Sequence, residues 1–271
     1  MGVLHMATGD EQRSDELFVE SVRKGFLVLE ALNRAGRPLR LSEIATLSGL
    51  GKSGAQRFVH TLRKLGLIRQ NAETKTFTLS PRILEYARSF FASSILCECA
   101  EPILRELATQ TGETVNLSEI DGADIVYTIR FPSIHSVSVD LTVGTRLPVF
   151  NTAGGRAILS RSPAERARAA IEACEIRPWT PHTLTDVGEI LEELGRIRAA
   201  GYALSNQEAF VGDISIAAPV VTFNGECVAA VNIAVPTPRW TVENALDVLM
   251  PRVVETAARI SSELGLPDDT A

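Results

Sequence analysis

One short segment near the N-terminus carries polar side chains at spacings that suit contact with the bases and phosphates of DNA. Over 52–65 the apolar residues recur at helical spacing and form one stripe. Gln56 has the paired hydrogen-bonding atoms that match an adenine edge, and Arg57 has those that match a guanine edge. The solvent-exposed face of an ordinary helix would show the same pattern. The neighbouring elements are therefore needed to distinguish a DNA-binding helix from an ordinary one. The polar residues opposite the stripe are Lys52, Ser53, Gln56, Arg57 and His60.

Two further helices are expected before this segment. Over 20–33, apolar residues recur at intervals of three and four, which predicts a helix with one buried face. A glycine and a proline then break the pattern, and 41–47 predicts a second helix with Ser42 as its N-cap. The buried stripe of the first helix is expected to contain Val22, Phe26, Leu29 and Leu32, and that of the helix over 52–65 to contain Ala55, Phe58, Val59, Leu62 and Leu65.

After these helices, two short alternating runs at 67–70 and 76–79 predict a β-hairpin. Three helices and a hairpin, with a turn containing glycine before the third helix, form a winged helix-turn-helix over 21–80. In that fold the third helix enters the major groove, and the hairpin touches the DNA backbone or the minor groove. The candidate DNA-binding set therefore also includes Lys24, Ser42 and Lys75.

The formal charge of −6 conceals two opposite balances. Residues 21–80 contain 11 Lys and Arg against 3 Asp and Glu, a balance of +8. Residues 93–271 contain 13 basic residues, all arginine, against 24 acidic ones, a balance of −11. A basic block on an acidic body predicts that the smaller part binds a polyanion and that the larger part does not. Together with the turn and the hairpin, this balance favours DNA binding over a merely solvated helix face.

The composition of the 271-residue chain excludes several other classes of protein. Hydrophobic residues make up 45% and charged residues 22%, as in a globular protein, and no apolar run approaches the roughly 18–20 residues that span a bilayer. The first ten residues lack the pattern of a secretory signal, so we expect a cytoplasmic protein without a membrane partner. Four scattered histidines and four cysteines form no metal-ligand pattern, and we expect no metal and no cofactor.

The pattern of the acidic body predicts an α+β domain over 94–267. We expect a linker helix over 81–93 before this domain, and a flexible extension over 1–20 before the basic block. Asp121-Gly122 is expected to form the hairpin turn between the first two strands of the body. The expected helices lie at 82–92, 95–111, 163–174, 186–200 and 242–264, and the expected strands near 114–120, 124–131, 137–143, 214–222 and 226–235.

A loop in the body has the features of an anion site. The segment 150–155 passes from an extended stretch into a helix and contains Gly154 and Gly155, which allow close approach. The N–H groups at the start of a helix favour a carboxylate. The alternative is that Thr152 or water caps those N–H groups and no ligand is needed. The candidate residues of this loop are Phe150, Thr152, Ala153, Gly154 and Gly155.

In many ordered segments the chain resembles the isocitrate lyase regulator (IclR) family of bacterial transcription factors. The likeness extends from Ser21 to about Leu266. Gly54-Ala55 departs from it, because the family usually carries a larger pair there. The segments that carry the resemblance are 21–25, 41–45, 51–53, 65–68, 112–115, 146–148, 152–153, 183–185, 197–198, 201–202, 216–220 and Pro236.

The resemblance implies a winged helix-turn-helix joined by a linker helix to a GAF-like effector-binding domain that also pairs subunits into dimers or tetramers. It also implies a set of ligand-facing positions on the strands. Relatives often have cysteine at 215 and serines at 232 and 234, so this chain offers fewer hydroxyls. With Phe150, Phe210 and Tyr127 as possible flat walls, an aromatic acid such as a hydroxybenzoate is favoured over a small keto acid. The implied positions are Glu208, Asp213, Ser215, Asn232 and Ala234.

The leading hypothesis is therefore a ligand-responsive transcriptional regulator that binds operator double-stranded DNA and a small carboxylic acid, and acts as a homodimer or homotetramer. The alternative is a small-molecule sensor or an enzyme that acts without DNA. Against an enzyme, the sequence has no G-x-S-x-G motif and no dinucleotide-binding fingerprint. We assign no catalytic residue. Glu208 and Asp213 could in principle exchange protons, but their spacing does not fix a geometry.

Overall fold

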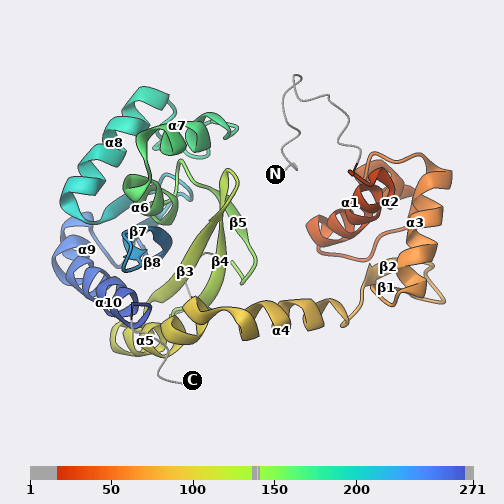
Figure 1. Cartoon of the computed structure of the whole chain (residues 1–271), viewed down its shortest axis with the longest axis horizontal. Helices are drawn as coiled ribbons and strands as arrows, with labels where there is room; N and C mark the ends of the chain where they lie inside the picture. The colour runs from red at the N-terminus through yellow and green to blue at the C-terminus, as the bar shows by residue number, and fades with distance from the viewer. Residues whose placement is uncertain (1–16, 136–138, 140, 266–271) are drawn as a thin grey trace. The chain divides into compact units, whose positions relative to one another are not determined.

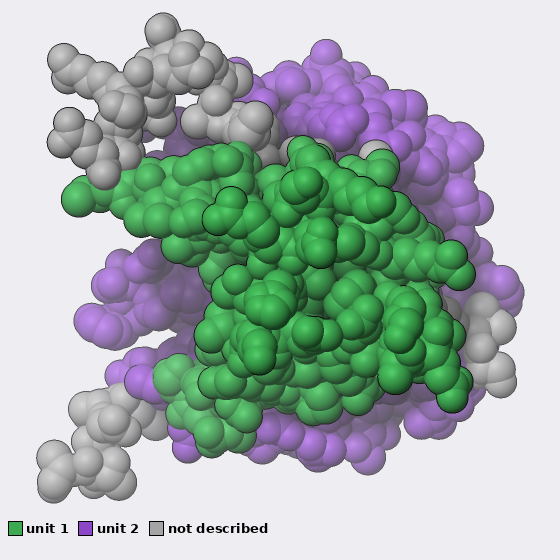
Figure 2. Space-filling view, turned by 90° about the vertical axis from the view of Figure 1, so that its right-hand side faces the viewer, with its two compact units in different colours: residues 1–93 green, residues 94–271 purple. Residues whose placement is uncertain are grey.

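The structure is a computed structural model that describes residues 17–135, 139 and 141–265. The chain divides into two compact units, residues 1–93 and 94–271, which are coloured separately in Figure 2. Most of the extension predicted over 1–20 lies outside the described residues. Within the described ranges, no helix is long and apolar enough to cross a membrane.

The first unit has the predicted winged helix-turn-helix (Figure 1). The two strands of the wing are antiparallel, and Leu39 forms an additional bridge to Phe77. The core is formed by apolar residues from every element, among them Val28, Ile44 and Val59. The elements are α1 (Glu20–Ala35), α2 (Leu41–Leu47), α3 (Lys52–Lys64), β1 (Ile68–Gln70) and β2 (Phe77–Leu79).

The apolar stripe predicted for α1 is wrong in part. Val22 and Phe26 are 55% and 59% exposed, whereas Val28 and Ala31 are fully buried. The first helix carries two apolar stripes, and successive residues turn by about 100°, so the stripe through Val28 faces away from the one through Phe26. Leu65 is also exposed, because α3 ends at Lys64 and Gly66, at φ 76°, turns the chain.

The N-cap predicted for α2 lies two positions too late in the sequence. The helix begins at Leu41 with Arg40 at its cap position, so Ser42 lies in the first turn. The carboxylate of Glu43 accepts a hydrogen bond from the backbone N–H of Arg40 at 2.8 Å. An acid in the first turn therefore satisfies the N–H group that precedes the helix.

The linker helix α4 (Ile83–Ser93) follows the wing and has no buried residue along its described length. Its large apolar side chains are largely exposed, Leu84 at 68%. An amphipathic helix of this kind has a face available to another surface.

The second unit is built on a six-stranded antiparallel sheet with the order β5-β4-β3-β8-β7-β6. Helices cover both faces, so the unit has three layers (Figure 1). The strands are β3 (Thr114–Asp121), β4 (Asp124–Phe131), β5 (Arg146–Pro148), β6 (Ala203–Asn206), β7 (Asp213–Val221) and β8 (Cys227–Pro236), and the helices are α5 (Ile95–Thr111), α6 (Ala153–Arg161), α7 (Ala164–Glu172), α8 (Val187–Ala200), α9 (Val242–Val248) and α10 (Met250–Glu263).

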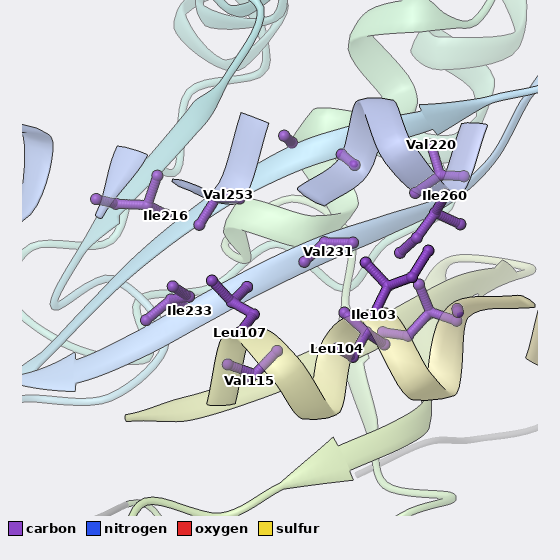
Figure 3. Packing of buried hydrophobic residues seen from close by; sticks show 14 of the residues in the cluster. Ile103, Leu104, Leu107, Val115, Ile216, Val220, Val231, Ile233, Val253 and Ile260 are labelled. Atoms are coloured by element: carbon purple, nitrogen blue, oxygen red, sulfur yellow. The ribbon is translucent and has the colours of Figure 1, made fainter. Parts of the chain in front are cut away.

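Strand alternation gives each face of the sheet its own core. Residues such as Val115, Ile216 and Val231 pack with α5 and α10 on one face, as Figure 3 shows. The neighbouring residues Ala217 and Ala230 point to the other face, toward α6 and α8. Because successive side chains in a strand point to opposite faces, the same strands also supply a cavity on the α6 side.

Three predicted details of this domain need correction. Of the strand predicted over 137–143, positions 137, 138 and 140 lie outside the described residues and the rest are not in a strand, while β5 forms at Arg146–Pro148. The hairpin turn is Gly122-Ala123, because Asp121 already pairs with Asp124. The helix predicted over 242–264 is interrupted at Leu249, since Pro251 in the first turn of α10 cannot donate a backbone hydrogen bond to the turn before it.

Candidate functional site

Five of the predicted DNA-binding residues line a groove beside α3. The groove has a volume of about 710 Å³ and lies between the start of α2, one side of α3 and the wing. It brings together Ser42, Lys52, Gln56, His60 and Lys75, all of them exposed. Residues far apart in the sequence therefore form one surface.

The remaining predicted DNA contacts lie beside this groove. Ser53 and Arg57 are exposed on α3, on the side opposite its buried residues Ala55 and Val59. Lys24 lies on α1, partly buried, with its ammonium group 3.5 Å from the carboxylate of Glu20. Lys24 thus has a local partner.

The sequence interpretation missed two arginines that line the groove, Arg40 and Arg63. Arg63 donates a hydrogen bond to the side chain of Gln70 at 2.9 Å and so links α3 to the wing. Arg63 lies seven residues after Gln56, which is close to two helical turns, so its spacing could have identified it. Arg40 lies outside the helix pattern and could be found only from the fold.

The wing places Lys75 by a local turn. The side-chain oxygen of Asn71 accepts hydrogen bonds from the backbone N–H groups of Glu73 and Thr74. Lys75 then adopts a left-handed conformation, with φ 57°, before the chain enters β2. A non-glycine residue in this conformation is uncommon and carries a conformational cost, so the surrounding turn must hold Lys75 in place.

The second unit contains a cavity of about 200 Å³ on the α6 side of the sheet. Alternate residues of β3, β7 and β8 face it, together with the first turn of α6 and the loop that precedes β7. Seven predicted effector residues line it: Thr152, Ala153, Gly154, Asp213, Ser215, Asn232 and Ala234. Phe210 and Tyr127 line it as well, and they provide aromatic walls.

A chain of hydrogen bonds runs across four strands along the cavity. Arg130 donates to the side-chain oxygen of Asn116 at 2.8 Å, and Asn116 donates to that of Asn232 at 3.3 Å. Asn232 in turn donates to the hydroxyl of Ser215 at 3.0 Å. Satisfied polar networks in a buried site are rigid, so these side chains have fixed orientations.

Arg130 enters the cavity because of a β-bulge. Leu117 pairs with Ile129 and Ser118 pairs with Tyr127, so Thr128 is an extra residue in β4. One extra residue reverses the alternation and brings Arg130 to the same face as Tyr127. Strict alternation from Tyr127 would have directed Arg130 to the opposite face, which is why sequence reasoning missed it.

The first turn of α6 presents backbone donors to the cavity. Thr152 accepts a hydrogen bond from the N–H of Gly155 at 3.3 Å, so part of the capping alternative is correct. The N–H groups of Ala153 and Gly154 have no partner within the described part of the chain, and both residues line the cavity. Such donors at the start of a helix favour a negatively charged ligand.

The two glycines of this turn serve packing more than ligand approach. A Cβ on Gly154 would lie 2.6 Å from the hydroxyl of Ser118, and one on Gly155 would lie 2.5 Å from backbone atoms of Val149. These close approaches seat α6 against the sheet. Gly154 still lines the cavity, whereas Gly155 does not.

Two more predicted residues lie outside the cavity lining. Phe150 is fully buried in the core between α6 and the sheet. Glu208 forms a buried ion pair with Arg156, with two hydrogen bonds of 2.7 and 2.6 Å, and also accepts one from the N–H of Leu184. Its carboxylate therefore links α6 to the loop before β7. The five-residue spacing between Glu208 and Asp213 could not reveal this ion pair.

Asp213 is the acid that does face the cavity. Burial raises its pKa from 3.8 to about 7, and the positive charge of Arg130 opposes part of this rise. Burial also raises the pKa of Tyr127 above its ordinary value, and the charge of Asp213 adds to the effect. Asp213 therefore changes charge near neutral pH. In the described part of the chain, no three His, Cys, Asp or Glu side chains are grouped to hold a metal ion.

Comparisons with known proteins agree with this division of the chain. Residues 21–72 match the IclR helix-turn-helix domain, and residues 91–262 match the bacterial transcriptional regulator IclR C-terminal domain. The chain belongs to the IclR family of bacterial transcriptional regulators. The resemblance identified from the sequence is thus confirmed, as is the arrangement of a helix-turn-helix domain followed by an α/β effector domain.

Individual IclR-family proteins align along most of the chain. The regulator KdgR of Dickeya chrysanthemi is 30% identical over 92% of this chain and 81% of its own length. The p-hydroxybenzoate hydroxylase transcriptional activator of Acinetobacter baylyi is 29% identical, with 93% and 94% covered. A proposed transcriptional regulator from Rhodococcus sp. RHA1, of known structure, is 35% identical, with 91% and 98% covered and a TM-score of 0.79. These relatives are transcriptional regulators, not enzymes.

Proposed function

We propose that this IclR-family protein is a ligand-responsive regulator that binds operator DNA through α3 and a small carboxylic acid in the cavity of its second unit. The best candidate for the effector is an aromatic acid such as a hydroxybenzoate. The observation that carries the proposal is the cavity, whose lining includes both Tyr127 and Phe210 and the start of α6, where the N–H groups of Ala153 and Gly154 have no partner among the described residues.

Size and chemistry both favour a small ring acid. A cavity of about 150 Å³ is enough to bind benzene, so one of about 200 Å³ accommodates a single substituted ring. The donors at the start of α6 suit a carboxylate, and Phe210 and Tyr127 suit an aromatic face. A relative named as the p-hydroxybenzoate hydroxylase transcriptional activator supports the same class. KdgR has a similar sequence identity to this chain, so sequence identity alone does not identify the effector. The choice of an aromatic acid therefore rests on the chemistry of the cavity.

On the DNA side, the exposed face of α3 supplies base contacts and the groove supplies phosphate contacts. Gln56 and Arg57 can bind base edges, while Lys52, Arg40 and Arg63 can neutralise phosphates. A ligand changes DNA affinity only if it binds two arrangements of the protein with different affinity. Such coupling typically amounts to about 1–3 kcal/mol.

Titration calorimetry of the full-length protein tests the cavity. Ala234→Leu adds a bulky side chain to the lining and should abolish binding of hydroxybenzoates, whereas Ala234→Ser, a matched control of nearly unchanged volume, should retain it. Gly154→Asp is unsuitable, because its Cβ would collide with Ser118. If Ala234→Leu binds the acid as tightly as the parent, the acid does not bind in this cavity.

We also infer that the protein acts as a dimer or tetramer and that α4 contributes to pairing. A two-fold dimer can bind two half-sites, and the exposed Leu84, Tyr86 and Phe90 give α4 apolar surface for pairing. Leu84→Glu with Phe90→Glu should shift the sedimentation of the protein toward the monomer and weaken binding to two-half-site DNA. Exchange of exposed Arg88 for Glu serves as the control. A parent protein that sediments as a monomer at micromolar concentration would refute this inference.

A further inference from the structure

We propose that the side chain of Asp213 recognises a hydrogen-bond donor on the effector, so that the cavity selects acids bearing a hydroxyl or ammonium group over otherwise identical acids that lack one. This inference rests on the proposed effector-binding function of the cavity.

The backbone holds Asp213 in place and leaves its side chain for another partner. The N–H of Asp213 donates to the carbonyl of Phe210 at 3.3 Å, and its carbonyl accepts from the N–H of Gln207 at 2.7 Å. As the first residue of β7, it faces the cavity two positions before Ser215. No described residue donates a hydrogen bond to its carboxyl group or forms an ion pair with it.

Two other buried acids of the same unit show what such a carboxyl group normally requires. Glu208 has Arg156 and the N–H of Leu184, and Glu113 accepts from Arg239 at 2.6 Å and from the indole of Trp240 at 2.9 Å. Buried carboxylates are generally paired or hydrogen-bonded, because burial without a partner is costly. Asp213 has no such partner among the described residues, and its position in the cavity wall would let a ligand provide one.

The neighbouring groups explain why a ligand donor is needed. An ionised carboxylate can only accept hydrogen bonds. Asn232 uses its amide to donate to Ser215 and its oxygen to accept from Asn116, so it has little capacity left for a ligand. Of the described residues that line the cavity, Tyr127 and Arg130, both from β4, are the other titratable or charged groups. Asp213 is therefore the acid among these lining residues, and a ligand hydroxyl or ammonium group complements it.

Selectivity follows from the cost of leaving Asp213 without a partner. A site built to pair a ligand hydroxyl strongly rejects the analogue without it, because the buried group then loses its partner. Burial raises the pKa of Asp213 to about 7, so the carboxyl group is largely ionised at pH 8 and largely protonated at pH 6. A charged acceptor forms the stronger hydrogen bond, so the preference for a donor should be greater at pH 8.

Calorimetry of the full-length protein with matched pairs of acids provides the test. The pairs are benzoate with 2-, 3- and 4-hydroxybenzoate, and propionate with lactate. At pH 8 the parent should bind at least one hydroxy acid about 10- to 100-fold more tightly than its partner. Asp213→Leu should reduce that ratio to about 1 or invert it, and Asp213→Asn should lower it while strengthening binding of the acid without the hydroxyl. Thermal melting checks that each variant is folded.

The outcomes separate this inference from the proposed function. If the acids bind but members of each pair bind equally, or if Asp213→Leu keeps the parent's ratio, the role assigned to Asp213 is wrong and the effector site stands. If none of these acids binds the parent at millimolar concentration, the proposed aromatic or small aliphatic effector is wrong, and the inference falls with it.

Discussion

The two candidate sites of this protein are built in opposite ways. The DNA-binding surface consists of exposed side chains that lie mainly on one helix, with Lys52, Gln56 and His60 along one side of α3. The effector cavity takes its lining residues from all six strands of the sheet, from the first turn of α6 and from the loops that precede β5 and β7. Substitution of one exposed residue affects mainly the contacts of that residue. Substitution of a buried residue in a hydrogen-bonded network also affects the strands and helices that pack around it. We therefore expect the larger effects of substitution in the second unit.

The largest effect is expected at the buried ion pair of the second unit. Glu208→Ala leaves the guanidinium of Arg156, which is 1% exposed, without its carboxylate, and removal of one partner from such a pair costs about 3–5 kcal/mol. Both tryptophans, Trp179 and Trp240, lie in this unit, so fluorescence-detected denaturation reports on its free energy of unfolding.

The exposed pair between Arg168 and Glu172 provides the control. Glu172→Ala should lower the free energy of unfolding by less than about 1 kcal/mol, because exposed ion pairs contribute little. If Glu208→Ala keeps nearly the parent's stability but loses the effector, then Glu208 contacts the ligand, as the family resemblance implied.

The next effect concerns the pH dependence set by Asp213. Its pKa is raised from 3.8 to about 7 in the folded protein, so the folded state keeps a proton that the unfolded chain releases between these values. Stability contributed by this group is present below about pH 4, falls as the pH rises, and is lost above about pH 7. One pKa unit corresponds to about 1.4 kcal/mol, which gives an upper limit of about 4 kcal/mol.

Asp213→Asn removes this titration. Without ligand, its free energy of unfolding should exceed that of the parent at pH 8 and approach it at pH 4. The measurement is urea denaturation followed by tryptophan fluorescence at several pH values. A constant difference between the two proteins from pH 4 to pH 8 would show that Asp213 does not titrate in this range.

The smallest effects are expected on the DNA-binding surface. Arg57→Ala or Gln56→Ala should cost about 1–3 kcal/mol in DNA binding and relax the preference at one base position. Lys52→Ala should weaken binding to all sequences alike and reduce the salt-dependence slope by about 1. Arg166→Ala, at an exposed arginine of the second unit, is the control and should leave DNA binding unchanged. Unchanged affinity and preference in both Arg57→Ala and Gln56→Ala would exclude α3 as the recognition helix.

The same contrast explains how far the sequence could predict each site. Helical periodicity alone placed Gln56 and Arg57 outside and Ala55 and Val59 inside, because one helix fixes the direction of its own side chains. Where an element has two apolar stripes, as α1 does, periodicity cannot choose between them, and Val22 and Phe26 were placed wrongly. That choice depends on which stripe the other helices cover.

The start of α6 could be predicted from its own residues, but the strand residues of the cavity could be predicted only through the family resemblance. Ser215, Asn232 and Ala234 face it because of strand register, which the sequence does not state. Arg130 depends on a bulge at Thr128, and Glu208 is diverted by Arg156, a residue 52 positions earlier in the chain. Contacts between residues far apart in the sequence therefore decide which polar side chains face the cavity and which bind one another.

The central claim is that occupation of the cavity changes DNA binding, and fluorescence anisotropy with promoter DNA from upstream of the protein's own gene tests it most directly. The affinity of the full-length parent should change about 5- to 150-fold when a hydroxy acid that binds by calorimetry is added at saturation. With Ala234→Leu, the same acid should cause no change. An acid that binds the cavity yet leaves the parent's DNA affinity unaltered would contradict the account.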